Sequence, residues 1–171
     1  MKHIEGRSFI AEVSITTPGF SGPIGVSEAT VSWARGWLVQ GSAEQPPLRL
    51  QFDYLEHSTD RVLYDITGAP QAGEYAGVKL GMSRNGYLGF YREAPVTDFW
   101  KLQVVWYVDH TEHVDFIWRN HDGYQVSMHE QVFSRPGLTL PDTRVQTQRW
   151  LAAGVGSGTA LQFLAKIERY V

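Results

Sequence analysis

Hydrophobic residues recur at every second position along most of this chain, and no stretch keeps an apolar stripe with helical spacing. An alternation with period two gives a β-strand one apolar and one polar face. The clearest examples are residues 9–15, 48–54, 78–82, 100–108 and 158–167. The pattern therefore predicts an all-β protein of about ten antiparallel strands.

Several links between these strands are short and rich in turn residues, namely 57–60, 85–86, 110–112 and 121–123. At 85–86 the dipeptide Asn-Gly supplies the two positive φ angles that a tight hairpin turn requires. Short links make strands that follow one another in sequence neighbours in space. A long meander of this kind avoids exposed edges by closing on itself. We therefore predict an antiparallel meander that closes into an up-and-down β-barrel.

The alternative architecture is a β-sandwich or jelly roll, which needs several long crossover connections. Four segments are long enough to supply them: 18–27, 41–47, 68–74 and 134–143. The sequence leaves this alternative open.

Length and composition indicate one folded domain. The chain has 171 residues, of which 43% are hydrophobic and 19% are charged, and a chain of this size can bury a core of its own. Residues 4–7, Ile-Glu-Gly-Arg, form the recognition sequence of factor Xa protease. We interpret residues 1–7 as an expression-tag remnant, keep them outside the fold, and assign residues 8–171 to the domain.

Charge and cysteine content limit the partners of the chain. Its net charge is −3 and no run of Lys or Arg occurs, which argues against nucleic acid and against an anionic membrane surface as partners. No apolar run approaches the roughly 20 residues of a membrane-spanning helix. Cysteine is absent, which slightly favours the cytoplasm but does not determine the compartment. No phosphate-binding or hydrolase motif is present, and we predict no cofactor.

Residues 109–130 hold four of the six histidines, together with several carboxylates. If three-residue loops join the strands here, Asp109 lies opposite His113, and Asp115 lies opposite both Tyr107 and His129. Cross-strand partners lie about 5 Å apart at Cβ, so these side chains could form a metal site or orient a histidine as a general base. The interpretation that we prefer is the solvated face of a half-buried sheet, with no metal.

A second notable feature is the stripe formed by Trp33, Arg35 and Trp37, which share one face if residues 29–39 form a single strand. Three interpretations follow. Both indoles belong to the core while a bulge at Gly36 turns Arg35 to water. Alternatively, the stripe faces the barrel interior and Arg35 binds an anionic ligand. In the third case the stripe faces outward as an aromatic platform for a sugar ring.

The interior interpretation defines a candidate site. Its ligand-binding residues would be aromatic or methionine side chains of the inward faces: Trp33, Trp37, Phe52, Met82, Trp106, Phe116, Trp118 and Met128. Arg35, Tyr54 and Tyr124 would stabilise developing negative charge. The predicted function is a β-barrel that binds an amphipathic small molecule, either as a carrier or as a cofactor-independent cyclase or isomerase.

The alternative function is a non-enzymatic recognition module, such as a lectin-like or attachment domain that binds a glycan or a protein. The absence of a visible nucleophile and base pair in the sequence suits this alternative. An exposed strand edge would favour a homodimer.

Overall fold

A computed structural model describes residues 4–28, 34–92, 95–107, 112–134, 145–154, 156 and 158–171. These residues form an all-β protein built on a closed antiparallel barrel, which confirms the predicted fold class. The described part contains thirteen strands, more than the ten predicted, because several short strands lie in connections. Within the described residues, no helix is long and apolar enough to cross a membrane.

Six strands form the barrel. They are β1 (Phe9–Ile15), β4 (Arg49–His57), β5 (Val62–Gly68), β8 (Trp100–Tyr107), β9 (His113–Arg119) and β13 (Phe163–Tyr170). Each of these strands pairs antiparallel with the next, and β13 pairs with β1 to close the ring. The barrel strands therefore follow chain order, as an up-and-down barrel requires.

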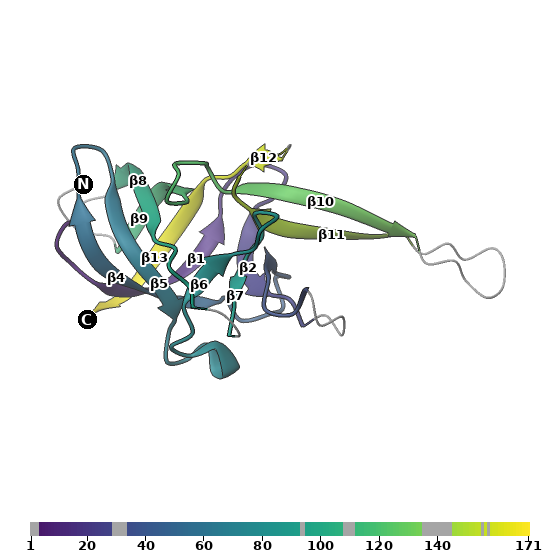
Figure 1. Ribbon diagram of the computed structural model, residues 1–171, viewed down its shortest axis with the longest axis horizontal. Coiled ribbons are helices and arrows are strands. Elements are labelled where there is room, and N and C mark those ends of the chain that lie inside the picture. The colour runs from purple at the N-terminus through teal and green to yellow at the C-terminus, as the bar shows by residue number, and fades with distance from the viewer. Residues whose placement is uncertain are drawn as a thin grey trace.

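Three insertions interrupt the meander. The first contains β2 (Gly22–Val26) and β3 (Leu38–Gln40); the second contains the one-turn helix η2 (Gly73–Tyr75), β6 (Leu80–Met82) and β7 (Leu88–Phe90); the third contains β10 (Ser127–Ser134), β11 (Val145–Ala152) and β12 (Thr159–Ala160). Because barrel neighbours run in opposite directions, the links after β1, β5 and β9 all leave from one end. The chain ends and the β4–β5 hairpin lie toward the opposite end (Figure 1).

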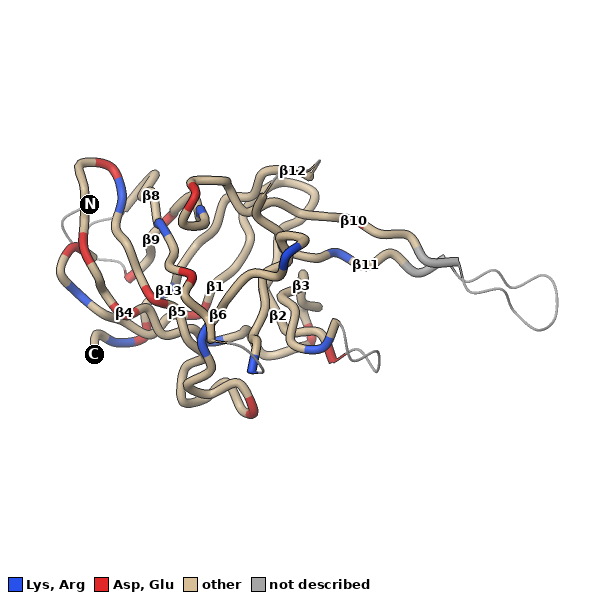
Figure 2. The backbone as a smooth tube through the Cα atoms, viewed as in Figure 1, with Lys and Arg blue, Asp and Glu red and all other residues tan. Residues whose placement is uncertain are grey.

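The first and third insertions build a second sheet with the strand order β12-β10-β11-β3-β2, which continues from β1. Strands β10 and β11 pair along their whole length, from Ser127 opposite Ala152 to Ser134 opposite Val145. They project from the body as a two-stranded arm (Figure 1). Most of the described arm is uncharged, as the tan colour of β10 and β11 shows (Figure 2). The charged residues of the two strands are Glu130 and Arg149, and these pair with each other at 2.8 Å.

The barrel interior is filled by its own side chains. Phe9 stacks on Phe52 with ring centroids 4.7 Å apart, and Trp118 meets Trp100 edge to face at 5.5 Å. Phe116 stacks on Phe163 of β13 with ring centroids 5.7 Å apart. All of these side chains are fully buried. A barrel of so few strands has an interior that side chains can fill completely. The predicted ligand-binding residues Phe52, Phe116 and Trp118 thus lie in the packed core.

The N-terminal segment is part of this core. Ile4 is 1% exposed, and the Tyr64 hydroxyl donates a hydrogen bond to the Ile4 carbonyl at 2.7 Å and lies 3.2 Å from the Arg7 carbonyl. The expectation that residues 1–7 lie outside the domain is therefore wrong for residues 4–7, and residues 1–3 lie outside the described part of the chain. Because residues 4–7 contain only one apolar residue, Ile4, they show no hydrophobic periodicity from which burial of the segment could be predicted.

Removing the Ile4 side chain tests this assignment. Ile4→Ala should lower the free energy of unfolding by about 2–5 kcal/mol, because it deletes buried methylenes and leaves a cavity. Val132→Ala, at a side chain that is 63% exposed, should cost less than about 0.5 kcal/mol. Urea denaturation measures both. Equal free energies of unfolding in Ile4→Ala and Val132→Ala would contradict a packed segment.

Candidate functional site

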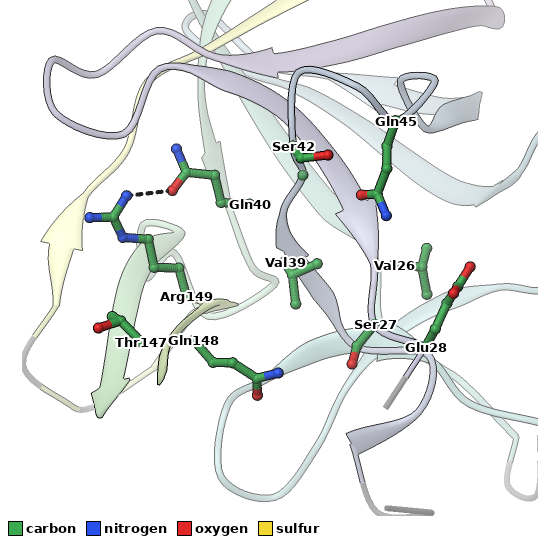
Figure 3. A pocket seen from close by; sticks show the side chains of 11 residues that line it. Val26, Ser27, Glu28, Val39, Gln40, Ser42, Gln45, Thr147, Gln148 and Arg149 are labelled. Atoms are coloured by element: carbon green, nitrogen blue, oxygen red, sulfur yellow. Dashed lines mark hydrogen bonds between the residues drawn. The ribbon is translucent and has the colours of Figure 1, made fainter. Parts of the chain in front are cut away.

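An open pocket of about 550 Å³ lies where β2, β3 and β11 meet (Figure 3). Its lining consists of Gln45 and three runs of consecutive residues: 26–28, 39–42 and 147–149. Successive residues of a strand point to opposite faces, so a pocket over one face would be lined by every second residue. This pocket therefore lies along strand edges and ends, where the main chain is accessible.

The pocket forms because β3 leaves β11 early. The two strands pair at one position, Trp150 opposite Val39. After Gln40 the chain turns away, and the Gly41 amide donates to the Pro23 carbonyl at 2.8 Å. A side chain at Gly41 would meet that carbonyl at 3.2 Å, so the close turn favours glycine. Strand β11 continues into the arm, and the pocket occupies the space left beside it.

Uncharged hydrogen-bonding groups dominate the lining. It contains the amides of Gln40, Gln45 and Gln148 and the hydroxyls of Ser27, Ser42 and Thr147. The described residues place no hydrogen bond on the side-chain amides of Gln45 and Gln148, which reach the pocket from the loop after β3 and from β11 (Figure 3). Each free amide offers both donors and an acceptor.

The positive charge of Arg149 in the pocket lining is already neutralised by an ion pair. The Arg149 guanidinium donates to the Glu130 carboxylate at 2.8 Å and to the side-chain amide oxygen of Gln40 at 2.9 Å. It also lies over the Phe20 ring, 5.0 Å from the centroid. Gln40 in turn donates to the Phe20 carbonyl at 2.8 Å. Arg149 and Gln40 are therefore fixed wall groups, whereas Gln45 and Gln148 are available to a ligand.

An aromatic cluster adjoins the pocket through Val39. Trp37 stacks on Tyr87 with centroids 4.3 Å apart, and Trp150 meets Trp37 edge to face at 5.3 Å. Val39 packs against this cluster and lines the pocket as well. Trp37 thus lies in a cluster separate from the barrel core, and Trp33 lies outside the described residues. Tyr91 closes the cluster by donating its hydroxyl to the Tyr87 carbonyl at 2.8 Å.

The interpretation that placed Arg35 inside the barrel is wrong. Its side chain is 62% exposed and forms an ion pair with Glu74 at 3.2 Å. The hydrogen bond to Glu74 and its negative charge raise the pKa of the Arg35 guanidinium above its usual value. Gly36 has φ of +87°, which breaks the alternation that a continuous strand would keep. The alternative with Arg35 turned to water beside Gly36 is confirmed for Arg35 and for the buried Trp37, whereas its assignment of Trp33 to the core falls outside the described residues.

The remaining predicted site residues are dispersed. The Tyr54 hydroxyl contacts His57 at 2.7 Å, and the Tyr124 backbone amide donates to the Asn120 side chain at 2.8 Å. Met82 contacts Asn120 through sulfur, Met128 is 2% exposed in the core, and Trp106 is 66% exposed on the outer face. The described contacts join Arg35, Tyr54 and Tyr124 to different partners, so the three are not brought together.

The predicted pairing of the histidine-rich strands is wrong. A bulge between Val104 and Trp106 sets Trp106 opposite Asp115, the place predicted for Tyr107. On its other side β9 pairs with β13, so that His113 lies opposite Lys166 and Asp115 opposite Leu164.

Strand β10 belongs to the second sheet, where His129 lies opposite Trp150. His113 and Asp115 are therefore separated from His129, and Asp109 lies outside the described residues. In the described residues, no group of three or more potential metal-ligating side chains gathers.

Sequence reasoning missed the pocket because its residues share no spacing. Gln45, Gln148 and Ser27 come from three distant segments, and the sequence marked only 41–47 and 18–27, as potential crossovers. Pairing between β3 and β11 is a long-range property that local periodicity does not encode. The uncharged character of residues 145–148 was the one available signal.

Comparisons with known protein families, with curated proteins and with solved structures each give no match for this chain. The chemistry of the site is therefore argued from its own residues.

Arg35 provides a direct test of its placement. Because its ion pair with Glu74 is exposed to water, we expect Arg35→Met to leave the Tm of the protein unchanged within error. Thermal unfolding monitored by circular dichroism measures this. A clear fall in Tm would contradict a solvent-facing side chain.

The partly buried side chain of Tyr91 leads us to predict that the folded state loses stability at alkaline pH. Burial, the largest cause, raises the pKa of Tyr91 to about 12. Since the folded state then holds a proton that the unfolded state loses above pH 10, stability is complete below pH 10 and falls as the pH approaches 12. Burial also raises the pKa of Tyr64.

Tyr91→Phe should therefore reduce the slope of unfolding free energy against pH in this window, by up to about 1.4 kcal/mol per pH unit, without abolishing it. Urea denaturation between pH 9 and pH 12 gives the slope. Identical slopes in the variant and the wild type would contradict the assignment.

Proposed function

We propose that this protein is a non-enzymatic binding module that takes an uncharged, hydrogen-bonding ligand in the pocket between β2, β3 and β11. The observation that carries the proposal is the pair of unengaged amides of Gln45 and Gln148 in an open pocket. Polar groups without protein partners in a concave site supply the orientation and specificity of a ligand complex.

Pocket size and charge support this assignment. A volume of about 550 Å³ lies within the range typical of ligand sites, roughly 300–1,000 Å³. Arg149 is held by Glu130 and Gln40, so an anionic ligand would have to displace an existing ion pair. A neutral ligand that alternates donors and acceptors, such as a saccharide or a peptide main chain, matches the amides without that cost.

A binding role also fits the kinds of side chain present. The described lining contains amides, hydroxyls, two valines, one glycine, Glu28 and Arg149. Of the side chains that commonly transfer protons, these lining residues include Glu28 alone, with neither a histidine nor a second carboxylate beside it. The other predicted function, a carrier, cyclase or isomerase with an amphipathic substrate inside the barrel, would need space that Phe52, Phe116 and Trp118 occupy.

The test is binding of uncharged ligands to pocket variants. We expect neutral oligosaccharides or uncharged peptides to raise the Tm of the wild-type protein, because a ligand that binds only the folded state stabilises it. Gln45→Ala and Gln148→Ala should each weaken binding about tenfold, as the loss of one ligand hydrogen bond predicts. Isothermal titration calorimetry gives the affinities.

Gln71→Ala is the matched control, because Gln71 is exposed and lies outside the pocket lining. Its affinity should equal that of the wild type. Ligand binding that both pocket variants retain at full strength would contradict the proposed site, as would stabilisation by anionic ligands alone.

A further inference from the structure

We propose that the ligand of this pocket is an extended, uncharged polypeptide segment that adds to the open edge of β11 as a further strand. The inference rests on the proposed function, because it names the ligand class of the same site. Its occupant is a segment of another polypeptide, held mainly through main-chain hydrogen bonds.

The edge of β11 is the first argument. On one side β11 pairs with β10 at all eight of its residues, whereas on the other side its register with β3 contains Trp150 alone. Main-chain N–H and C=O groups of an antiparallel strand point to both sides. Beyond Trp150, the one residue of β11 in register with β3, the Thr147 N–H and C=O and the Arg149 N–H point to the β3 side and have no strand partner in the described part of the chain. Such an edge is a template for another strand.

The shape of the pocket is the second argument. The run 147–149 lines it with consecutive residues, so the exposed edge itself forms one wall. Residues 41–45 diverge from β11 and form the opposite wall, which leaves the path that β3 would have followed had it continued. An extended segment advances about 3.4 Å per residue, so a few residues fill this path beside β11.

The side chains around the path are the third argument. Side chains of successive residues in an added strand would point to opposite faces of the sheet. One face carries Val39 and Gln148, and the other carries Gln40 and Arg149. This follows from the pairing of Val39 with Trp150, which places Gln148 on the same face as Val39. Neither surface offers an unpaired cation, because Arg149 is engaged by Glu130. Glu28, the other charged residue of the lining, follows β2 and lies on the side of the pocket away from Gln148 and Arg149 (Figure 3), so the segment that fits along β11 is uncharged.

Within the described residues, the β10 edge is also open beyond Met128, where pairing with β12 ends. That edge lacks the second wall that Gly41, Ser42 and Gln45 supply at the β11 edge. A saccharide would use the amides but not the main-chain edge. The requirement for main-chain N–H groups in the ligand therefore separates a strand from a sugar.

The experiment selects dodecapeptides from a random library on the full immobilised chain and then examines the strongest binder by N-methyl scanning. Methylation removes one main-chain donor at a time and leaves the protein unaltered. We expect methylation at alternate residues to weaken binding about tenfold and methylation at the intervening residues to have less than a twofold effect, because only every second N–H faces β11. Hydrogen exchange at the Thr147 and Arg149 amides, which face the pocket, should slow when the peptide binds, whereas exchange at the Gln148 amide, which faces β10, should not.

Protein variants locate the complex. Gln148→Ala should weaken peptide binding, and Gln131→Ala should not, because Gln131 lies opposite Gln148 on β10, one strand farther from the pocket. Peptide binding that N-methylation does not affect in an alternating pattern would overturn the inference. Saccharide binding that depends on Gln148, with no peptide selected, would overturn it and leave the proposed function standing. Binding of neither class would overturn both.

Discussion

The pairing of β1 with two different partners on one side is the constraint on which the rest of the structure depends. Its first half, from Phe9 to Glu12, pairs with β4 and closes the barrel, whereas Ser14 and Ile15 pair with β2 and begin the second sheet. Arg49 lies at this fork and forms ion pairs with Glu12 on β1 and with Glu168 on β13. The negative charge of Glu168, together with its hydrogen bond, raises the pKa of the Arg49 guanidinium.

Closure of the barrel pairs its six strands with one another in a ring, so the exposed strand edges lie in the second sheet. There the pairing is unequal: β10 and β11 share eight pairs, β2 and β3 share three, and β3 and β11 share one. The pocket opens where strand pairing is sparsest, between the short β3 and the start of the arm. The rigid barrel thus supports a sheet that is incomplete at a defined position, and the uncharged side chains gather there.

Local periodicity predicted the class of fold because each barrel strand alternates and because its partners in the ring follow chain order. It failed where geometry departs from a straight strand. The positive φ of Gly36 turned Arg35 outward, and the bulge before Trp106 shifted β8 against β9. It also failed at a distance, since β9 pairs with β13 and not with β10. The pocket could not be predicted from sequence, because its walls come from β2, β3 and β11, which only the second sheet brings together.

The arrangement of the chain ends has a practical consequence. Phe9 lies opposite Tyr170, and the Val171 amide donates to the Ser8 carbonyl at 3.0 Å, so the start of β1 and the end of β13 lie side by side on neighbouring strands. They lie toward the end of the barrel opposite the insertions that form the pocket (Figure 1). A linker could therefore lead from Val171 to the N-terminal segment with Ile4 kept in place, and new ends could be opened in the β4–β5 hairpin, a circular permutation that leaves the barrel order intact. The protein could likewise be tethered to a surface by either end with its pocket facing outward.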